Sequence, residues 1–168
     1  MTSPLQAAFD HHVWATLRVL EVCEELTDDQ LATTVPGTYG SIIDTLRHTV
    51  GADAGYLWFL SGGDRPAIDE EAMNLPDLRR EMEVDATAWA ALIARAFDPD
   101  EVLVRRRDDG SETHAPRGIR LAQAVHHGTD HRSQICTALT TLGIEPPEID
   151  VWDFGVVTGS VLEVEPTV

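Results

Sequence analysis

The segment Gly118–Leu142, with the sequence GIRLAQAVHHGTDHRSQICTALTTL, is the part of this chain that decides its fold. The segment is predicted to form a long amphipathic helix. Gly143 follows in the C′ position, where glycine readily adopts a left-handed conformation, and Pro146-Pro147 lies just beyond it. A long helix with a defined end is therefore predicted near the end of the chain.

Three earlier segments also have the periodicity of amphipathic helices. In the first, Leu5, Phe9 and His12 belong to one face at about 100° per residue, and Pro4 stands near the first turn, where proline is favoured. Ser41 is a typical N-cap for the second. The predicted helices cover about Pro4–Leu26, Ser41–Leu60 and Pro76–Phe97.

The segments between these helices are predicted to be short. The Asp108-Asp109-Gly110 turn signal predicts a small hairpin or an extended arm within Glu101–His114. The aromatic tail from Ile149 is predicted to be a short helix or an arm packed on the core. Four long amphipathic helices without a strong strand pattern predict an all-α protein, an antiparallel four-helix bundle that forms one domain over residues 1–168.

The charge of the chain excludes several classes of function. Twelve basic residues, all of them arginine, stand against 29 acidic residues and give a formal net charge of −17. Binding to nucleic acid or to an anionic membrane surface depends on clustered cations, so neither partner is expected. Because there is no lysine, a P-loop nucleotide site and a Schiff base with pyridoxal phosphate are also excluded.

The cysteine content, the N-terminal sequence and the hydropathy predict the cellular location of the protein. Cys23 and Cys136 are far apart and outside any CxxC pattern, so neither a disulfide framework nor a thiolate zinc site is expected. The N-terminal sequence lacks the basic and apolar segments of a signal peptide. No apolar run approaches the roughly 20 residues that span a bilayer. We therefore expect a cytoplasmic protein.

His127 and His131 are four residues apart in the predicted last long helix, so both rings emerge from one face. This HxxxH spacing is common at transition-metal sites, because two imidazole nitrogens can converge on an ion about 2 Å away. Arg120 and Gln134 share the face, which makes it more polar than a core face. A metal would satisfy two buried imidazoles, whereas the alternative is that the spacing carries no function.

A third ligand is expected from another helix, and His48 is the candidate. It shares a face with Gly51, Ala52 and Gly55, whose small size would let a neighbouring backbone approach closely. The alternative is a histidine that is simply hydrogen-bonded between two helices.

Three side chains are candidates for supporting roles around such a site. Asp44, one turn before His48, could orient the imidazole or act only as a charge near the helix N-terminus. Gln134 lies on the metal face. His12 could hydrogen-bond a metal-bound water or be a core histidine whose ring nitrogens are satisfied. Arg132 points away from the metal face and is expected in an ion pair or an interface.

These residues bring the sequence close to a known family. The stretch Ala124–Ile135, AVHHGTDHRSQI, resembles the H-x3-H-R-x-Q signature of the DinB/YfiT-like superfamily of metal-dependent proteins. Gly40–His48, GSIIDTLRH, is similar to the second-helix motif of that family, and Phe9–Ala15, FDHHVWA, is similar to its first-helix pattern. The resemblance extends over about residues 5 to 155.

The resemblance implies a four-helix bundle, often dimeric, that holds a divalent metal, typically zinc or nickel, on three histidines. By position these ligands would be His48, His127 and His131. One departure is Asp130, which stands where the family frequently has a further histidine directly before the second ligand. The three-histidine site is expected to survive this change, because Asp130 points about 100° away from His131.

The characterised enzymes of the superfamily carry out transfer or isomerisation with low-molecular-weight thiols such as mycothiol or bacillithiol. The resemblance therefore implies a metal-dependent thiol S-transferase that acts on a small-molecule substrate. The alternatives are a metal-dependent hydrolase, in which Asp44 or His12 would serve as the base, and a non-catalytic, stress-associated metal-binding dimer. A homodimer is expected, with Trp14, Trp58 or the aromatic tail at the interface or, equally well, packed in the core.

Overall fold

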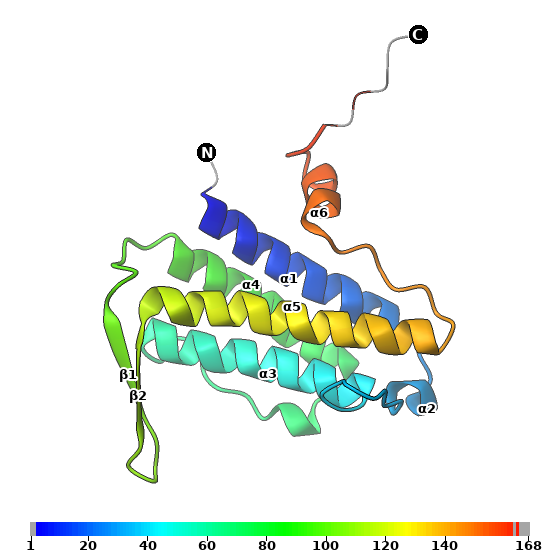
Figure 1. The fold of residues 1–168 in the computed structure, drawn as a ribbon, viewed down its shortest axis with the longest axis horizontal. Helices are drawn as coiled ribbons and strands as arrows, with labels where there is room; N and C mark the ends of the chain where they lie inside the picture. The colour runs from blue at the N-terminus through cyan, green and yellow to red at the C-terminus, as the bar shows by residue number, and fades with distance from the viewer. Residues whose placement is uncertain (1–2, 163, 165–168) are drawn as a thin grey trace.

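The computed structural model describes residues 3–162 and 164 of the chain. Helices dominate these residues, and four of the helices are long (Figure 1). The long helices are α1 (Pro4–Cys23), α3 (Ile42–Ser61), α4 (Leu75–Ile93) and α5 (Arg117–Thr141). The shorter elements are α2 (Asp28–Leu31), the 3-10 helix η1 (Glu70–Ala72), the strands β1 (Val102–Arg106) and β2 (Glu112–Pro116), and α6 (Val151–Val157).

The four long helices lie side by side around an apolar core (Figure 1). Both α1 and α3 pack against α4 and against α5. Between α1 and α4 the ring centres of Phe9 and Trp89 are 4.4 Å apart, and both side chains are buried. A mostly helical protein with a hairpin before its last long helix is therefore confirmed. No helix among the described residues is long and apolar enough to cross a membrane.

Local capping explains why two of the long helices begin or end close to their predicted positions. The Ser41 Oγ accepts a hydrogen bond from the Asp44 N–H at 3.2 Å, so α3 begins directly after its predicted cap. Gly143, with φ of +73°, follows the end of α5 in the left-handed region. Both signals act over a few residues, which is why the sequence alone reveals them.

Two helices end earlier than predicted. α4 ends at Ile93 and not at Phe97, because its last turn tightens and the Arg95 N–H donates to the Leu92 carbonyl at 3.2 Å. α1 ends at Cys23 and not at Leu26, since its last turn tightens into a 3-10 pattern in which the Leu26 N–H donates to the Cys23 carbonyl at 3.1 Å.

The antiparallel hairpin β1–β2 is attached to the start of α5 (Figure 1). Arg120 of α5 makes the attachment, because its Nη2 donates to the carbonyl oxygens of Leu103 at 3.1 Å and of Thr113 at 2.9 Å. The same guanidinium lies 4.5 Å from the ring centre of Phe59 in α3. One side chain thereby connects both strands to the two helices that carry the candidate site.

The tail returns to α1, as predicted, through the short helix α6 (Figure 1). The ring of Phe154 is 5.5 Å from that of Trp14, and the His11 Nε2 lies 2.8 Å from the carbonyl oxygen of Ile149. Trp14 therefore packs within the chain. Trp152, in contrast, is 73% exposed.

Candidate metal centre

Three histidines meet between α3 and α5. The Nε2 atom of His127 is 3.0 Å from the Nε2 of His48 and 3.2 Å from the Nε2 of His131. One nitrogen from each ring lies within 4.8 Å of the others. Because α3 and α5 pack directly against each other, His48 joins the HxxxH pair from the neighbouring helix. The structure thus brings together the three histidines that the sequence singled out.

The donor set fits a divalent transition metal. Nitrogens about 2 Å from a tetrahedral zinc ion lie about 3.3 Å apart, close to the two short separations between the rings. The Nδ1 of His127 is buried without a hydrogen-bond partner in the described structure, so this ring makes its polar contacts through Nε2 alone. Imidazole suits zinc, nickel, copper and iron, so the residues fit a metal without selecting one.

Gln134 sets the tautomer of His131. Its Oε1 accepts the Tyr39 backbone N–H at 2.9 Å, and this fixes the amide orientation because a backbone N–H can only donate. The same oxygen lies 3.1 Å from the His131 Nδ1, which must therefore carry the proton. The lone pair of His131 is then on Nε2, the nitrogen that faces the other two rings.

Tyr39 covers the outer side of the cluster. Its ring stacks on that of His48 with centres 4.1 Å apart and planes 9° from parallel, and it meets His131 edge-on. Sequence reasoning did not single out Tyr39 as a site residue. An aromatic residue between Gly37 and Gly40, just before the His48 helix, was the signal available for it.

Burial keeps the imidazoles of His48 and His127 in the neutral form that binds metal. It lowers the pKa of His127 to about 4, with smaller contributions from the neighbouring His131 and His48. Burial also lowers the pKa of His48, and His131 adds to this, while the Glu70 carboxylate acts in the opposite direction. A neutral imidazole has its lone pair available, so His48 and His127 have no proton to lose before binding an ion at neutral pH.

Asp44 is not placed to orient His48. Its Oδ2 accepts a hydrogen bond from the Ser41 Oγ at 2.5 Å, and its Oδ1 faces the Arg47 Nη1 at 3.6 Å. In the part of the chain that the structure describes, no hydrogen bond joins Asp44 to His48. The N-cap draws the carboxylate towards the start of α3, where it acts as a helix-terminal charge, the alternative that the sequence left open.

His12 is a core histidine with both ring nitrogens engaged. It is fully buried, its Nε2 lies 2.6 Å from the Asp53 Oδ2, and its Nδ1 lies 3.1 Å from the Arg132 Nη1. Because a guanidinium can only donate, Nδ1 accepts and Nε2 carries the proton that is donated to Asp53. Neither nitrogen is left for a metal-bound water, so the core-histidine alternative is the one observed.

Arg132 belongs to the same buried network, which sequence reasoning missed. Its Nη1 also donates to the Thr16 Oγ1 at 3.0 Å and its Nη2 to the Thr129 Oγ1 at 3.1 Å. Among the described residues it forms no ion pair, contrary to one of the two expectations, and burial lowers its pKa to about 10. Gly128 makes room for the network, since a Cβ there would lie 2.3 Å from the His12 Cε1.

Glu70, in η1, is a site residue that sequence reasoning also missed. Its carboxylate lies against α3 at Gly51, where an added Cβ would come within 2.7 Å of the Glu70 Oε1. The expectation that a backbone would approach this face is therefore wrong, because a side chain fills the space. Nothing lies within 4 Å of a Cβ added at Gly55, so that part of the face is open.

Two open cavities reach the cluster. The larger, of about 460 Å³, is lined by α3, the hairpin and α5 and includes His48 and His127. The other, of about 370 Å³, includes Tyr39, Asp44 and His48. Glu70 lines both cavities. His48 and His127 are therefore accessible to small molecules, as a site that exchanges ligands requires.

The HxxxH pair, the single upstream histidine and the adjoining helices agree with a match of the sequence to the DinB family over residues 1–160. The chain belongs to the DinB family. No curated protein sequence matches the chain. The cluster of His48, His127 and His131 is thus a candidate metal site within a DinB-family protein.

Proposed function

We propose that this DinB-family protein is a metal-dependent transferase that uses a low-molecular-weight thiol such as mycothiol or bacillithiol. The observation that carries the proposal is that His48 and His127 line an open cavity, so three imidazole ligands leave room for an exchangeable fourth. A zinc or nickel ion bound there supplies a Lewis acid that stabilises a thiolate. The packing of the four long helices supports a single antiparallel four-helix bundle as its scaffold.

The thiols of the chain itself are poorly placed to act as the nucleophile. Cys23 is buried, and burial raises its pKa to about 12. Burial also raises the pKa of Cys136, which is half-buried. Neither residue lines the two cavities beside the histidines. A reactive thiol therefore has to enter as a ligand, which favours a thiol cofactor.

We assign Glu70 as the group that accepts the proton of the thiol. A thiol that binds as thiolate gives up the proton of its S–H group, and the Glu70 carboxylate lines both cavities beside His48. Gln134 keeps the His131 Nε2 free of that proton by holding the Nδ1–H. The aromatic ring of Tyr39 limits access of water to the outer side of His48.

Glu70 also favours a second candidate function, a metal-dependent hydrolase. In that reaction the carboxylate would accept the proton of an activated water. The sequence offered Asp44 and His12 as the base, but the structure engages the first with the helix start and the second with Asp53. Turnover that needs the metal but no thiol would identify the hydrolase.

The first test is the metal itself. Protein purified without a chelator or a His tag should contain about one zinc or nickel ion per chain by elemental analysis, as expected for three converging imidazoles. A His127→Ala/His131→Ala double variant should lose the ion and keep its far-UV circular dichroism. His126→Ala is the matched control, because His126 is the exposed neighbour in the same helix. Equal metal content in all three proteins would contradict the site.

The second test is turnover. Metal-loaded protein should consume a haloaromatic electrophile only when mycothiol, bacillithiol or a similar thiol is present, and the double variant should not. Metal bound without turnover for any thiol would instead indicate the non-catalytic metal-binding protein.

We also propose that the protein is a homodimer that associates through α6. Trp152 and Val151 on this helix are 73% and 63% exposed, although α6 packs on α1 through Phe154. Exposed aromatic and aliphatic side chains on one short helix are typical of protein–protein contacts.

A further inference from the structure

The larger cavity beside the histidines has two chemically different ends. One end holds His48 and His127, and Glu70 lies against α3 near it. The other end holds Arg120, whose guanidinium lies over the ring of Phe59, together with Arg105 of strand β1. Burial lowers the pKa of Arg120, and the positive charge of the nearby Arg105 lowers it further. Two positive charges therefore share one wall of the cavity.

The spacing between the two ends follows from helix geometry. Arg120 and His127 are seven residues apart in α5, which corresponds to about 10 Å along the helix axis. On the facing helix α3, the ring of His48 lies against His127 and the ring of Phe59 lies against Arg120. The two helices therefore define the same two levels along the groove between them. Between these levels Gly55 has no side chain to fill the space. An elongated molecule can thus lie along the groove between α3 and α5.

The two arginines of this cavity differ from most others in the chain. Eight of the twelve arginines pair with a carboxylate. Arg105 and Arg120 have no such partner among the described residues. Arg120 donates only to backbone carbonyls, and its Nε is buried with no hydrogen-bond partner there. In a chain with 29 acidic residues, two positive charges without an internal counter-charge are left for a ligand.

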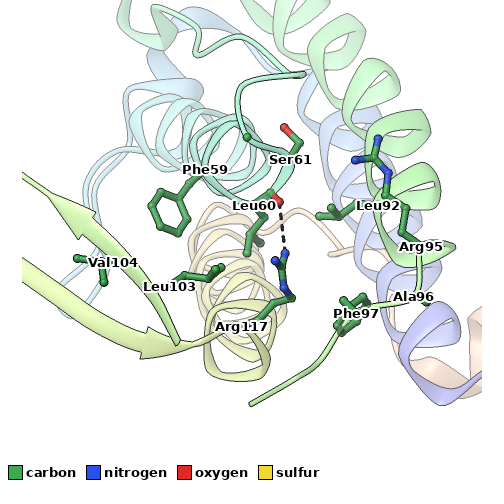
Figure 2. Close-up of a pocket in the computed structure, with 11 residues that line it drawn as sticks. Phe59, Leu60, Ser61, Leu92, Arg95, Ala96, Phe97, Leu103, Val104 and Arg117 are labelled. Carbon is green, nitrogen blue, oxygen red and sulfur yellow. Dashed lines mark hydrogen bonds between the residues drawn. The ribbon is translucent and has the colours of Figure 1, made fainter. Parts of the chain in front are cut away.

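A neighbouring cavity provides the contrast. It is of similar size, about 450 Å³, and also contains two arginines (Figure 2). Here Arg117 donates to the Glu101 carboxylate at 2.7 Å and to the Leu60 carbonyl, and Arg95 pairs with Asp64 at 3.2 Å. Those charges are already neutralised within the protein. The arrangement around Arg105 and Arg120 is therefore not a general property of cavities in this chain.

We propose that the cavity binds a substrate with an anionic group, a carboxylate or a phosphate, on Arg105 and Arg120, about 10 Å from the end that reaches the histidines. The proposal rests on the proposed function for the histidine end, because it assigns the reacting group of the substrate to that end. The cavity is also lined by Tyr56, Trp58 and Phe59, against which the apolar middle section of the substrate would pack. The substrate class is then an amphipathic anion, and the hairpin supplies the residue that selects it.

The test compares matched ligands by isothermal titration calorimetry. Zinc-loaded protein is titrated with mercaptohexanoate and with mercaptohexanol, which have the same thiol and chain and differ in the charged end. We expect the acid to bind about tenfold more tightly than the alcohol, as for a charge-assisted hydrogen bond. Arg105→Ala should remove this preference. Arg106→Ala should retain it, because Arg106 is the next residue of the strand and pairs with Glu112.

A second pair of ligands separates this proposal from the proposed function. Phenylbutanoate and phenylbutanol lack a thiol and are titrated against metal-free protein. A preference for the carboxylate that Arg105→Ala abolishes would support the anion site even if neither thiol binds, an outcome that would contradict the thiol chemistry alone. Equal binding of acid and alcohol in both pairs, or a preference that survives in Arg105→Ala, would overturn the proposal.

Discussion

Gly128 shows how a single residue positions the buried network beside the histidines. The His12 ring occupies the volume that a side chain at position 128 would need. This close approach brings His12 within reach of Arg132 on the same helix as Gly128. The contact between His12 and Arg132 therefore depends on residue 128 having no side chain.

Substitution of this glycine gives the first prediction at the residue scale. Gly128→Ala should lower the free energy of unfolding by about 1–3 kcal/mol, because the methyl group forces His12 out of its place. Gly55→Ala is the matched control, a glycine inside helix α3 with nothing within 4 Å of an added Cβ. That change should leave stability unchanged or raise it by up to about 1 kcal/mol through helix propensity. Urea unfolding measures both, and equal effects would contradict the packing argument.

At the scale of elements, helix α4 contains a buried carboxylate, that of Asp85. Asp85 is fully buried, and its Oδ1 accepts a hydrogen bond from the Arg65 Nε at 2.6 Å. Glu81, one turn earlier, pairs with the same guanidinium at 2.7 Å. The Asp85 Oδ2 is buried without a partner in the described residues. Burial outweighs Arg65 and raises the pKa of Asp85 to about 7.

The raised pKa of Asp85 predicts how the stability of the protein changes with pH. The folded state binds the Asp85 proton more tightly than the unfolded state, so stability falls as the pH rises from about 4 towards 7. Asp85→Asn removes this titration. The difference in unfolding free energy between wild type and variant should therefore change steadily over that range in urea titrations. Glu83→Gln, at an exposed position on the same helix, is the control for the loss of an acidic side chain. A constant difference for Asp85→Asn would contradict the assignment.

The elements that sequence reasoning predicted are those with local signals. Ser41 indicates the start of a helix and Gly143 the end of one, and both signals act over a few residues. The two histidines of the HxxxH pair lie on one helix, so their rings come together without any contact between elements. His48, whose partners are in another helix, was a candidate from its place on a helix face of small residues, and the family resemblance supported it.

The residues that sequence reasoning missed depend on contacts between elements. Glu70 reaches the site from a 3-10 turn whose position follows from how the chain packs, and Tyr39 reaches it from a loop. Asp53 and Asp85 had a usable signal, because each lies at helical spacing among apolar neighbours and is thus a buried polar residue that needs a partner.

At the scale of the whole molecule, the charge of −17 opposes association of two copies. A dimer that forms through the apolar face of α6 should therefore strengthen as salt screens this repulsion. Light scattering should show a larger dimer fraction at high salt than at low salt. Trp152→Ser should shift the protein towards monomer, whereas Val84→Ser, at an exposed apolar position on α4, should not. Dimerisation that is unaffected by Trp152→Ser would place the interface elsewhere.

The two cavities that share His48 and Glu70 also bear on the order of events in catalysis. Reagents that approach from separate sides can be bound at the same time, so neither has to leave before the other arrives. A ternary complex of protein, thiol and electrophile is then sterically allowed without a covalent enzyme intermediate. Steady-state kinetics of a two-substrate reaction at this centre would give intersecting double-reciprocal plots, and not the parallel lines of a ping-pong cycle.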